Sequence, residues 1–483
     1  MNETLLLIGG ESLPAADGRF FHRMNPVSGK PATKAAASSL REVDAAVKAA
    51  AMAFPAWAAT GPGQRRELLL RAADILMAHQ GEFILSMISE TGSSEGWAGF
   101  NVAFGASVLR EAASMTTQIS GEVIPSDVPD NLAMAIRQPV GVCVGMAPWN
   151  APVILGVRAI AMPLACGNTV VFKASESCPA VHRLIGTMLH EAGIPAGVVN
   201  ILTNDPADAP EIVGGLIDHS LVRHVNFTGS TRVGRIIAER AARHLKPVLL
   251  ELGGKAPLLV LDDADLAAAV NAAAFGAFMN QGQICMSTER IVVDERVADE
   301  FIARLSAKAA ALPVKDPSQG PTVLGAVVDT QSAEKISALI ENAVENGARL
   351  CAGGKRDGTL LSATVLDHVT PAMRIYAEES FGPVVTVVRV NGDEEALRVA
   401  NDTEYGLSAA IFSRDIARAW NVARRVDSGI CHINGPTVHD EPQMPFGGMK
   451  ASGYGRFGGK AAIDEFTALR WITIQTGDRH YPF

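Results

Sequence analysis

The sequence predicts an α/β protein with two units, each built on a largely parallel sheet that helices cover. From residue 140 onward, short apolar runs that suit strands buried on both faces alternate with helical segments. A second alternation of the same kind runs from residue 258 to about residue 434. With 483 residues, 48% hydrophobic and 19% charged, the chain is expected to fold throughout.

The first third is expected to be helical and to end in a small β excursion. Residues 43–59 and 64–79 place Ala, Leu and Ile at 3.6-residue spacing, which predicts amphipathic helices. Pro62 and Gly63 separate them. In residues 121–139, prolines and aspartates mark turns between short strand-like runs, so we expect a few strands there.

The two alternations define the remaining elements. The first predicts strands at 140–147, 168–174, 198–203, 221–229 and 247–254, joined by helices at 152–165, 179–192, 208–218 and 231–243. The second predicts strands at 257–263 and 290–294 and helices at 264–280 and 297–311. The first series is typical of a doubly wound, nucleotide-binding layout.

Composition excludes several classes of function. The net charge is -9 and no long basic run is present, so we expect no nucleic-acid partner. The apolar run 5–10 is too short for an export signal, and the longer runs 156–172 and 266–279 are interrupted or too short to cross a membrane. The six cysteines show neither CxxC nor metal-ligand spacing, which predicts no metal site and a reduced, cytoplasmic setting.

A phosphate site is predicted where FTGSTRVG (227–234) follows a strand and opens a helix. Backbone amides around Gly229 and Ser230 would then lie at a helix N-terminus, where the dipole favours a pyrophosphate. The alternative is a turn that only caps the helix. Lys173 and Glu176 follow another strand, where a carboxylate can accept both hydroxyls of a ribose, or where the two side chains form a surface ion pair.

Three further residues suggest covalent chemistry. Glu251 ends a strand within an apolar run, and burial there would raise its pKa toward that of a general base, unless it is a structural carboxylate that caps the glycine turn. Cys285 lies in the loop NQGQICMS (280–287), the only cysteine in a setting that suits a thiolate nucleophile. Asn150 follows a buried strand and could supply an amide to an oxyanion hole.

These motifs occur in a specific order that resembles the NAD(P)-dependent aldehyde dehydrogenase superfamily along nearly the full chain. The order is PWN (148–150), KxxE (173–176), FTGS (227–230), ELGGK (251–255), GQxC (282–285), EESFGPV (378–384) and PFGGMKASGYGR (445–456). The resemblance implies a Rossmann-like cofactor domain (1–119 and 140–251), an α/β catalytic domain (252–467) and a β oligomerisation arm (120–139 and 468–483). A homodimer or homotetramer is therefore expected.

The resemblance also implies residue roles. Cys285 would attack the aldehyde and pass through a thiohemiacetal to a thioester, Glu251 would activate the hydrolytic water, and Asn150 with the Cys285 amide would hold the oxyanion. The residues implied to bind NAD are Trp149, Lys173, Glu176, Gly229, Ser230, Gly234, Leu252, Glu379 and Phe381. Two departures limit the carry-over: TNDPAD (203–208) replaces a glycine-rich turn, and Ala468 replaces a second glutamate of some relatives.

The substrate implied is an aromatic aldehyde. Residues 147–176 and 431–448 most resemble bacterial dehydrogenases of the salicylaldehyde and vanillin types, so salicylaldehyde is favoured, with vanillin or benzaldehyde next. The candidate pocket residues are Trp97, Arg158, Ile284, Met286 and Val438, for which ordinary core packing is the alternative. Two other functions stay open: a succinate-semialdehyde-type enzyme, in which Arg158 binds a carboxylate, and a non-catalytic protein on the same fold.

Overall fold

The computed structural model describes residues 2–483 and contains the doubly wound sheet that the sequence predicts. Five parallel strands in the spatial order β12-β11-β8-β9-β10 form its centre. These strands are β8 (Val142–Met146), β9 (Thr169–Lys173), β10 (Val199–Leu202), β11 (Val222–Thr228) and β12 (Val248–Glu251). The connecting helices are α5 (Pro152–Ala165), α6 (Pro179–Glu191), α7 (Ala209–Asp218) and α8 (Thr231–Ala242).

The strand order reverses between β8 and β11, and this point determines where a ligand can bind. Chain connections leave β8 toward β9 on one side of the sheet and reach β11 on the other. In open α/β sheets the crevice at the carboxyl ends of the strands beside such a reversal is the usual ligand site. The residues that follow β8 and β11 are therefore the first to consider.

The N-terminal third contains strands that the sequence analysis did not expect. Helices α1 (Leu40–Ala59) and α2 (Pro62–Ala78) form as predicted and are followed by α3 (Gln80–Thr91) and α4 (Glu95–Met115). The strands before them are β1 (Asn2–Thr4), β2 (Leu6–Ile8), β3 (Glu11–Leu13), β4 (Phe20–Met24) and β5 (Pro31–Ala36). The purely helical prediction for this region was wrong because most of these strands are too short to show a period.

A second, seven-stranded sheet has the order β15-β18-β19-β14-β13-β20-β21. Its strands are β13 (Ala256–Val260), β14 (Thr288–Asp294), β15 (Arg349–Ala352), β18 (Thr364–Asp367), β19 (Val384–Val390), β20 (Ser408–Phe412) and β21 (Ile430–Ile433). Its helices are α9 (Leu266–Phe278), α10 (Glu295–Ala310), α11 (Thr330–Glu345), α12 (Arg374–Ala377), α13 (Gly392–Asn401) and α14 (Ile416–Ala423). Separate apolar cores lie under the two sheets, and the cleft between them holds the site described below.

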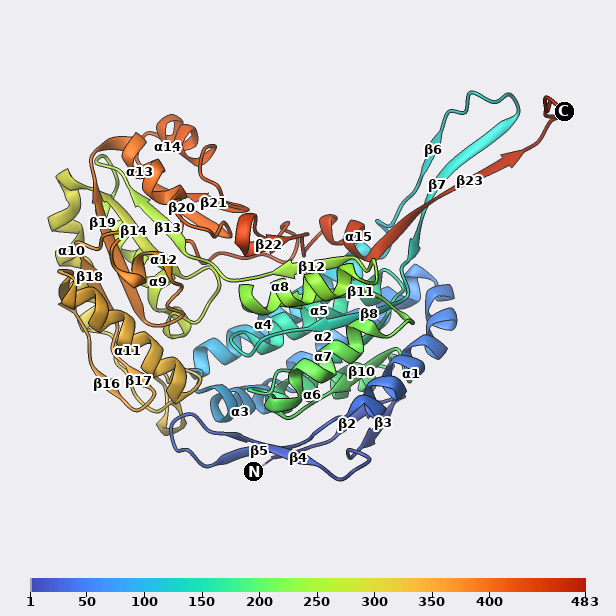
Figure 1. Ribbon diagram of the computed structural model, residues 1–483, viewed down its shortest axis with the longest axis horizontal. Helices are drawn as coiled ribbons and strands as arrows, with labels where there is room; N and C mark the ends of the chain where they lie inside the picture. The colour runs from blue at the N-terminus through green and yellow to red at the C-terminus, as the bar shows by residue number, and fades with distance from the viewer. Residues whose placement is uncertain (1) are drawn as a thin grey trace.

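The β excursion forms an arm that projects away from both sheets (Figure 1). Its strands β6 (Glu122–Ile124), β7 (Asn131–Pro139) and β23 (Thr467–Gln475) are antiparallel, in the order β23-β7-β6. Helix α15 (Ala461–Phe466) leads into β23, while β22 (Gly453–Tyr454) pairs with β12 and so links the late chain to the first sheet. Among residues 2–483, no helix combines the length and the apolar character needed to cross a membrane.

Candidate active site

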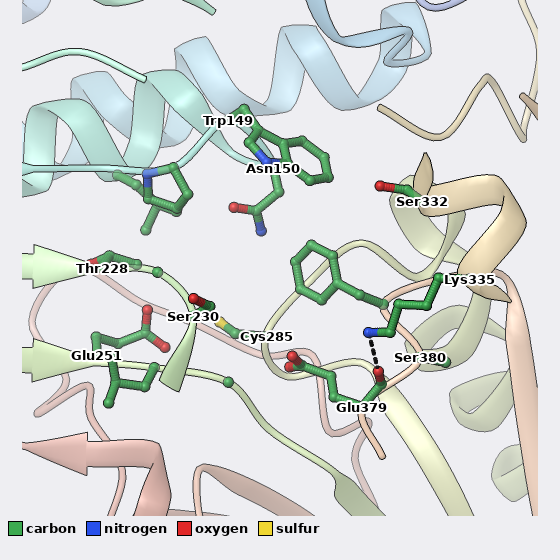
Figure 2. Close-up of a pocket in the computed structure, with 16 residues that line it drawn as sticks. Trp149, Asn150, Thr228, Ser230, Glu251, Cys285, Ser332, Lys335, Glu379 and Ser380 are labelled. Atoms are coloured by element: carbon green, nitrogen blue, oxygen red, sulfur yellow. Dashed lines mark hydrogen bonds between the residues drawn. The ribbon is translucent and has the colours of Figure 1, made fainter. Parts of the chain in front are cut away.

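Two cavities meet at the carboxyl ends of β8, β11 and β12. One, of about 270 Å³, is lined by residues that follow these three strands and by the loop 379–381. The other, of about 440 Å³, lies toward α4 and the late loop 436–446. The two share Asn150, Leu155 and Cys285. Figure 2 shows the first cavity, with the predicted base Glu251 at the end of a strand and the predicted nucleophile Cys285 on a loop.

The loop of Cys285 is held in a defined conformation by its backbone and by a buried amide. It follows a short 3-10 turn in which Asn280 and Gln281 adopt left-handed φ angles of 48° and 55°. The Gln281 side chain donates to the Ala326 main-chain oxygen at 2.9 Å. A Cβ atom at Gly254 would lie only 2.3 Å from the Cys285 carbonyl oxygen, so the glycine turn after Glu251 is required for this approach.

Glu251 is a buried carboxyl group with unusual properties. It ends β12, is 1% exposed, and neither of its side-chain oxygens has a hydrogen-bond partner among the described residues. Burial raises its pKa to about 7, and the Cys285 thiol and the positive charge of Arg158 only partly oppose this rise. Burial, together with the neighbouring Glu251 carboxylate, also raises the pKa of Cys285 well above its usual value. A carboxyl group with the pKa of Glu251 can take up and release a proton near neutral pH, as a general base requires.

Asn150 is oriented by three hydrogen bonds. Its side-chain nitrogen donates to the main-chain oxygen of Gln283 at 2.9 Å, two residues before the nucleophile. Its own main-chain oxygen accepts from Trp97 Nε1 at 2.9 Å and from Asn280 Nδ2 at 3.0 Å. These bonds place the amide at the junction of the two cavities, as an oxyanion donor would require.

The turn between β11 and α8 only partly matches the predicted phosphate site. Ser230 caps α8 and lines the first cavity, and the first amides of the helix have no carbonyl partner within the helix. The Gly229 amide, however, donates to the Glu251 main-chain oxygen at 3.0 Å. The prediction that this amide holds a pyrophosphate was wrong, because the β11–β12 pairing already uses it.

Gly234 and Leu252, two other predicted cofactor residues, pack against each other. Gly234 does not line the first cavity, whereas Leu252 does. A Cβ atom at Gly234 would lie 2.5 Å from the Leu252 side chain. The glycine therefore allows α8 to pack closely behind Leu252, which is a structural role.

Lys173 is the last residue of β9, next to β8 in the sheet, and Glu176 follows three residues later. The two side chains form an ion pair that is largely buried, so the surface ion pair considered above is not what forms. Asn204, within the unusual segment 203–208, donates to Glu176 Oε1 at 2.9 Å. Glu176 is thus fixed at the same edge of the sheet as Ser230, outside the first cavity.

The loop with Glu379 and Phe381 closes the first cavity opposite β8. Glu379 accepts a hydrogen bond from the Gly254 amide at 2.8 Å, and burial raises its pKa to about 7. Phe381 packs edge-on against Trp149, with ring centroids 5.8 Å apart. Lys335, which the sequence analysis did not single out, donates to the Glu379 main-chain oxygen at 2.8 Å (Figure 2).

A second buried carboxylate, Glu289, holds this loop in place. Its oxygens accept from Ser380 Oγ at 2.8 Å and from the Phe381 amide at 2.9 Å. Glu289 also pairs with Lys255 at 2.7 Å, and both side chains are at most 4% exposed. Charge-assisted bonds in a buried setting are strong, so this pair fixes the position of Glu379 and Phe381.

All five predicted pocket residues line the second cavity: Trp97, Arg158, Ile284, Met286 and Val438. Several aromatic side chains that the sequence analysis missed complete its wall, namely Phe100, Phe104, Phe275 and Phe446. Trp97 and Phe100 stack with ring centroids 5.5 Å apart. The helical spacing 97, 100, 104 was a usable signal, because residues at i, i+3 and i+7 share one face.

Arg158 lines this cavity and is 6% exposed. It pairs with Asp440, which also lines the cavity, and its guanidinium lies 4.5 Å from the centre of the Phe446 ring. Arg158 therefore faces the cavity and is paired with a carboxylate of the same wall. No local pattern could have found Asp440, since 282 positions separate it from Arg158.

Comparison with known proteins identifies close relatives. The sequence pattern of the aldehyde dehydrogenase family matches residues 13–472. A vanillin dehydrogenase of Pseudomonas fluorescens is 64% identical over 482 residues, which cover 100% of both chains. The crystal structure of a salicylaldehyde dehydrogenase from Pseudomonas putida G7 complexed with salicylaldehyde superposes with a TM-score of 0.99, at 51% identity and full coverage of both chains. PnpE in complex with nicotinamide adenine dinucleotide superposes with a TM-score of 0.95, at 36% identity over 99% of each chain.

Proposed function

Because the chain belongs to the aldehyde dehydrogenase family, and is therefore an enzyme that oxidises an aldehyde with a nicotinamide cofactor, we propose that its substrate is an aromatic aldehyde. Salicylaldehyde and vanillin are the preferred candidates, since relatives at 51% and 64% identity carry those names. The product is the corresponding carboxylic acid, and NAD is the hydride acceptor.

The second cavity carries this proposal. Trp97, Phe100, Phe104 and Phe446 give it aromatic walls, and it ends on Cys285. Aromatic side chains pack on a substrate ring in stacked or edge-to-face geometry. Each such contact stabilises the complex by about 0.5–1.5 kcal/mol beyond the contribution of the apolar area that it buries. A ring held between these walls presents its aldehyde carbon to the thiol.

The residues at the junction supply the proton chemistry. The Cys285 thiol loses its proton to solvent, the resulting thiolate sulfur bonds to the aldehyde carbon, and the Asn150 amide donates to the oxygen that becomes negative. The bound nicotinamide supplies a cationic acceptor for the hydride that leaves this carbon. Glu251 then removes a proton from the water that attacks the resulting thioester of Cys285, and the acid leaves as the thiolate re-forms.

The cofactor residues fit a dinucleotide without a 2′-phosphate. The N-terminus of α8, where the first amides lack carbonyl partners within the helix and Ser230 caps one of them, suits a pyrophosphate. Glu176 carries a negative charge because the Lys173 ammonium and the Asn204 amide lower its pKa against the effect of burial. A carboxylate there accepts from free ribose hydroxyls and repels a phosphate, which supports NAD over NADP.

The arm supports assembly into a homodimer or homotetramer. Val123, Leu469 and Trp471 on the arm are 70%, 63% and 76% exposed. Strands β6 and β23 are the outer strands of the arm sheet, and each offers a free edge. A second copy of the chain could cover these apolar side chains and pair with one of the free strand edges, so that neither remains exposed to water. We assign the oligomerisation role to residues 120–139 and 468–483 on this basis. The cofactor domain is then formed by residues 1–119 and 140–251, and the catalytic domain by residues 252–467.

A reducing compartment, the cytoplasm, suits the chemistry. The six cysteines are free, and Cys285 must remain a thiol to react. Oxidation of Cys285 would remove the nucleophile.

Steady-state kinetics test the substrate class. Salicylaldehyde, vanillin and benzaldehyde are compared with propanal, hexanal and succinate semialdehyde, with NAD at saturation. The proposal requires kcat/KM for the aromatic aldehydes to exceed that for the others by at least about tenfold. This ratio corresponds to roughly 1.4 kcal/mol of additional stabilisation from contacts with the ring. Equal or better use of an aliphatic aldehyde or of succinate semialdehyde refutes it.

A further inference from the structure

The ion pair in the wall of the second cavity has unused hydrogen-bonding capacity. Arg158 bonds through one nitrogen, Nη2, to Asp440 Oδ2, and this is the one hydrogen bond that residues 2–483 provide to its guanidinium. The other carboxylate oxygen, Asp440 Oδ1, is buried and has no partner within the same residues. A buried charged acceptor without a partner is energetically unfavourable, so this wall is incomplete without a ligand that donates to it.

A phenolic hydroxyl complements both members of the pair. Such a group has one O–H donor and oxygen lone pairs that accept. The hydroxyl O–H can donate a hydrogen bond to Asp440, while the hydroxyl oxygen accepts one from a free N–H group of Arg158. The Phe446 ring, whose centre is 4.5 Å from the guanidinium, limits the directions from which the hydroxyl can approach Arg158.

The charge of Asp440 also works against one class of ligand. Arg158 and Asp440 together carry no net charge, and Asp440 is 15% exposed, so water screens it poorly. A substrate carboxylate that approaches Arg158 must also approach the Asp440 carboxylate, and like charges at close range repel. Specificity of this kind depends on a repulsive element as well as an attractive one.

We propose that Asp440 determines the substrate class: it accepts a hydrogen bond from a ring hydroxyl and excludes aldehydes that carry a carboxylate. This inference deepens the proposed function and rests on it. Arg158 alone would bind an anion, and its pairing with Asp440 converts the site into one for a neutral, hydroxylated ring.

The substitution Asp440→Asn tests the proposal, because it keeps the shape and removes the charge. The substrates are benzaldehyde, its 2-, 3- and 4-hydroxy forms, and its 3- and 4-carboxy forms, with benzaldehyde as the internal reference. Relative to benzaldehyde, kcat/KM for the best hydroxy form should fall about tenfold or more, and that for the best carboxy form should rise about tenfold or more. Glu441→Gln is the matched control, since this neighbouring carboxylate is exposed and does not line the cavity.

Unchanged ratios in Asp440→Asn would overturn the proposal. If Asp440→Asn loses benzaldehyde activity as well, the double variant Arg158→Met with Asp440→Asn decides, since it removes both charges. Loss of the hydroxyl preference with benzaldehyde activity retained supports the inference, and a retained hydroxyl preference contradicts it. Failure of the proposed function is a different result, visible in the unaltered enzyme as preference for aliphatic aldehydes.

Discussion

Glu251→Gln should make the enzyme slower and the fold more stable. The carboxyl group is buried, and its pKa rises from 4.5 to about 7 because folding removes it from water. One pKa unit corresponds to about 1.4 kcal/mol, so ionised Glu251 destabilises the folded state by about 3 kcal/mol at pH 8. At pH 5 the folded protein keeps the proton, and most of this penalty is absent. The glutamine variant should therefore gain stability at pH 8 and little at pH 5.

The same substitution should remove the base. A positioned general base contributes about 10²–10⁴-fold, so steady-state turnover should fall by that factor, while rapid NADH formation in the first turnover persists. In the unaltered enzyme, turnover should rise about tenfold between pH 6 and pH 8 as the base ionises around pH 7.

Denaturant unfolding at both pH values and stopped-flow NADH absorbance measure these effects. The control is Glu67→Gln, an exposed glutamate on α2, which should alter neither quantity. Equal stability change at pH 5 and pH 8 would refute the reasoning on burial. Loss of the first-turnover NADH together with turnover would show that Glu251 is needed before the thioester forms.

Three further substitutions give separate predictions. Cys285→Ala should abolish oxidation and leave NAD binding intact by calorimetry, and residual turnover would move the nucleophile elsewhere. Glu176→Gln should narrow the preference for NAD over NADP, measured as the ratio of kcat/KM, whereas equal use of both by the unaltered enzyme would place this carboxylate away from the ribose. Glu289→Gln leaves Lys255 unpaired and should lower the free energy of unfolding by about 3–5 kcal/mol and raise KM for NAD about tenfold, with little change in aldehyde KM. An unchanged KM for NAD would show that Glu289 does not position the loop of Glu379 and Phe381 for cofactor binding.

The central fold was predictable because its signals are local. Strands buried on both faces, such as β8 and β9, are short continuous apolar runs, and the helices between them have the 3.6-residue period. The N-terminal strands were not predictable in this way, since β1, β2 and β3 have three residues each and depend on partners elsewhere in the chain. Tertiary pairing, not sequence period, makes them strands.

The site was predictable wherever its chemistry follows a strand or a glycine turn. Cys285, Glu251 and Asn150 all follow this rule, and all three line the first cavity. The engaged Gly229 amide, the Glu289 support and the Asp440 partner of Arg158 each depend on a contact between distant segments. No property of the neighbouring residues encodes such a contact.

The central claim is that an aromatic acyl group forms on Cys285 where the two cavities meet. The Glu251→Gln variant is mixed with NAD and salicylaldehyde, quenched with acid within the first turnover and digested, and the peptide that contains Cys285 is analysed by mass spectrometry. The account predicts a 2-hydroxybenzoyl thioester on Cys285, in an amount equal to the NADH formed. NADH formation with an unmodified Cys285, or with the acyl group on another residue, would contradict it.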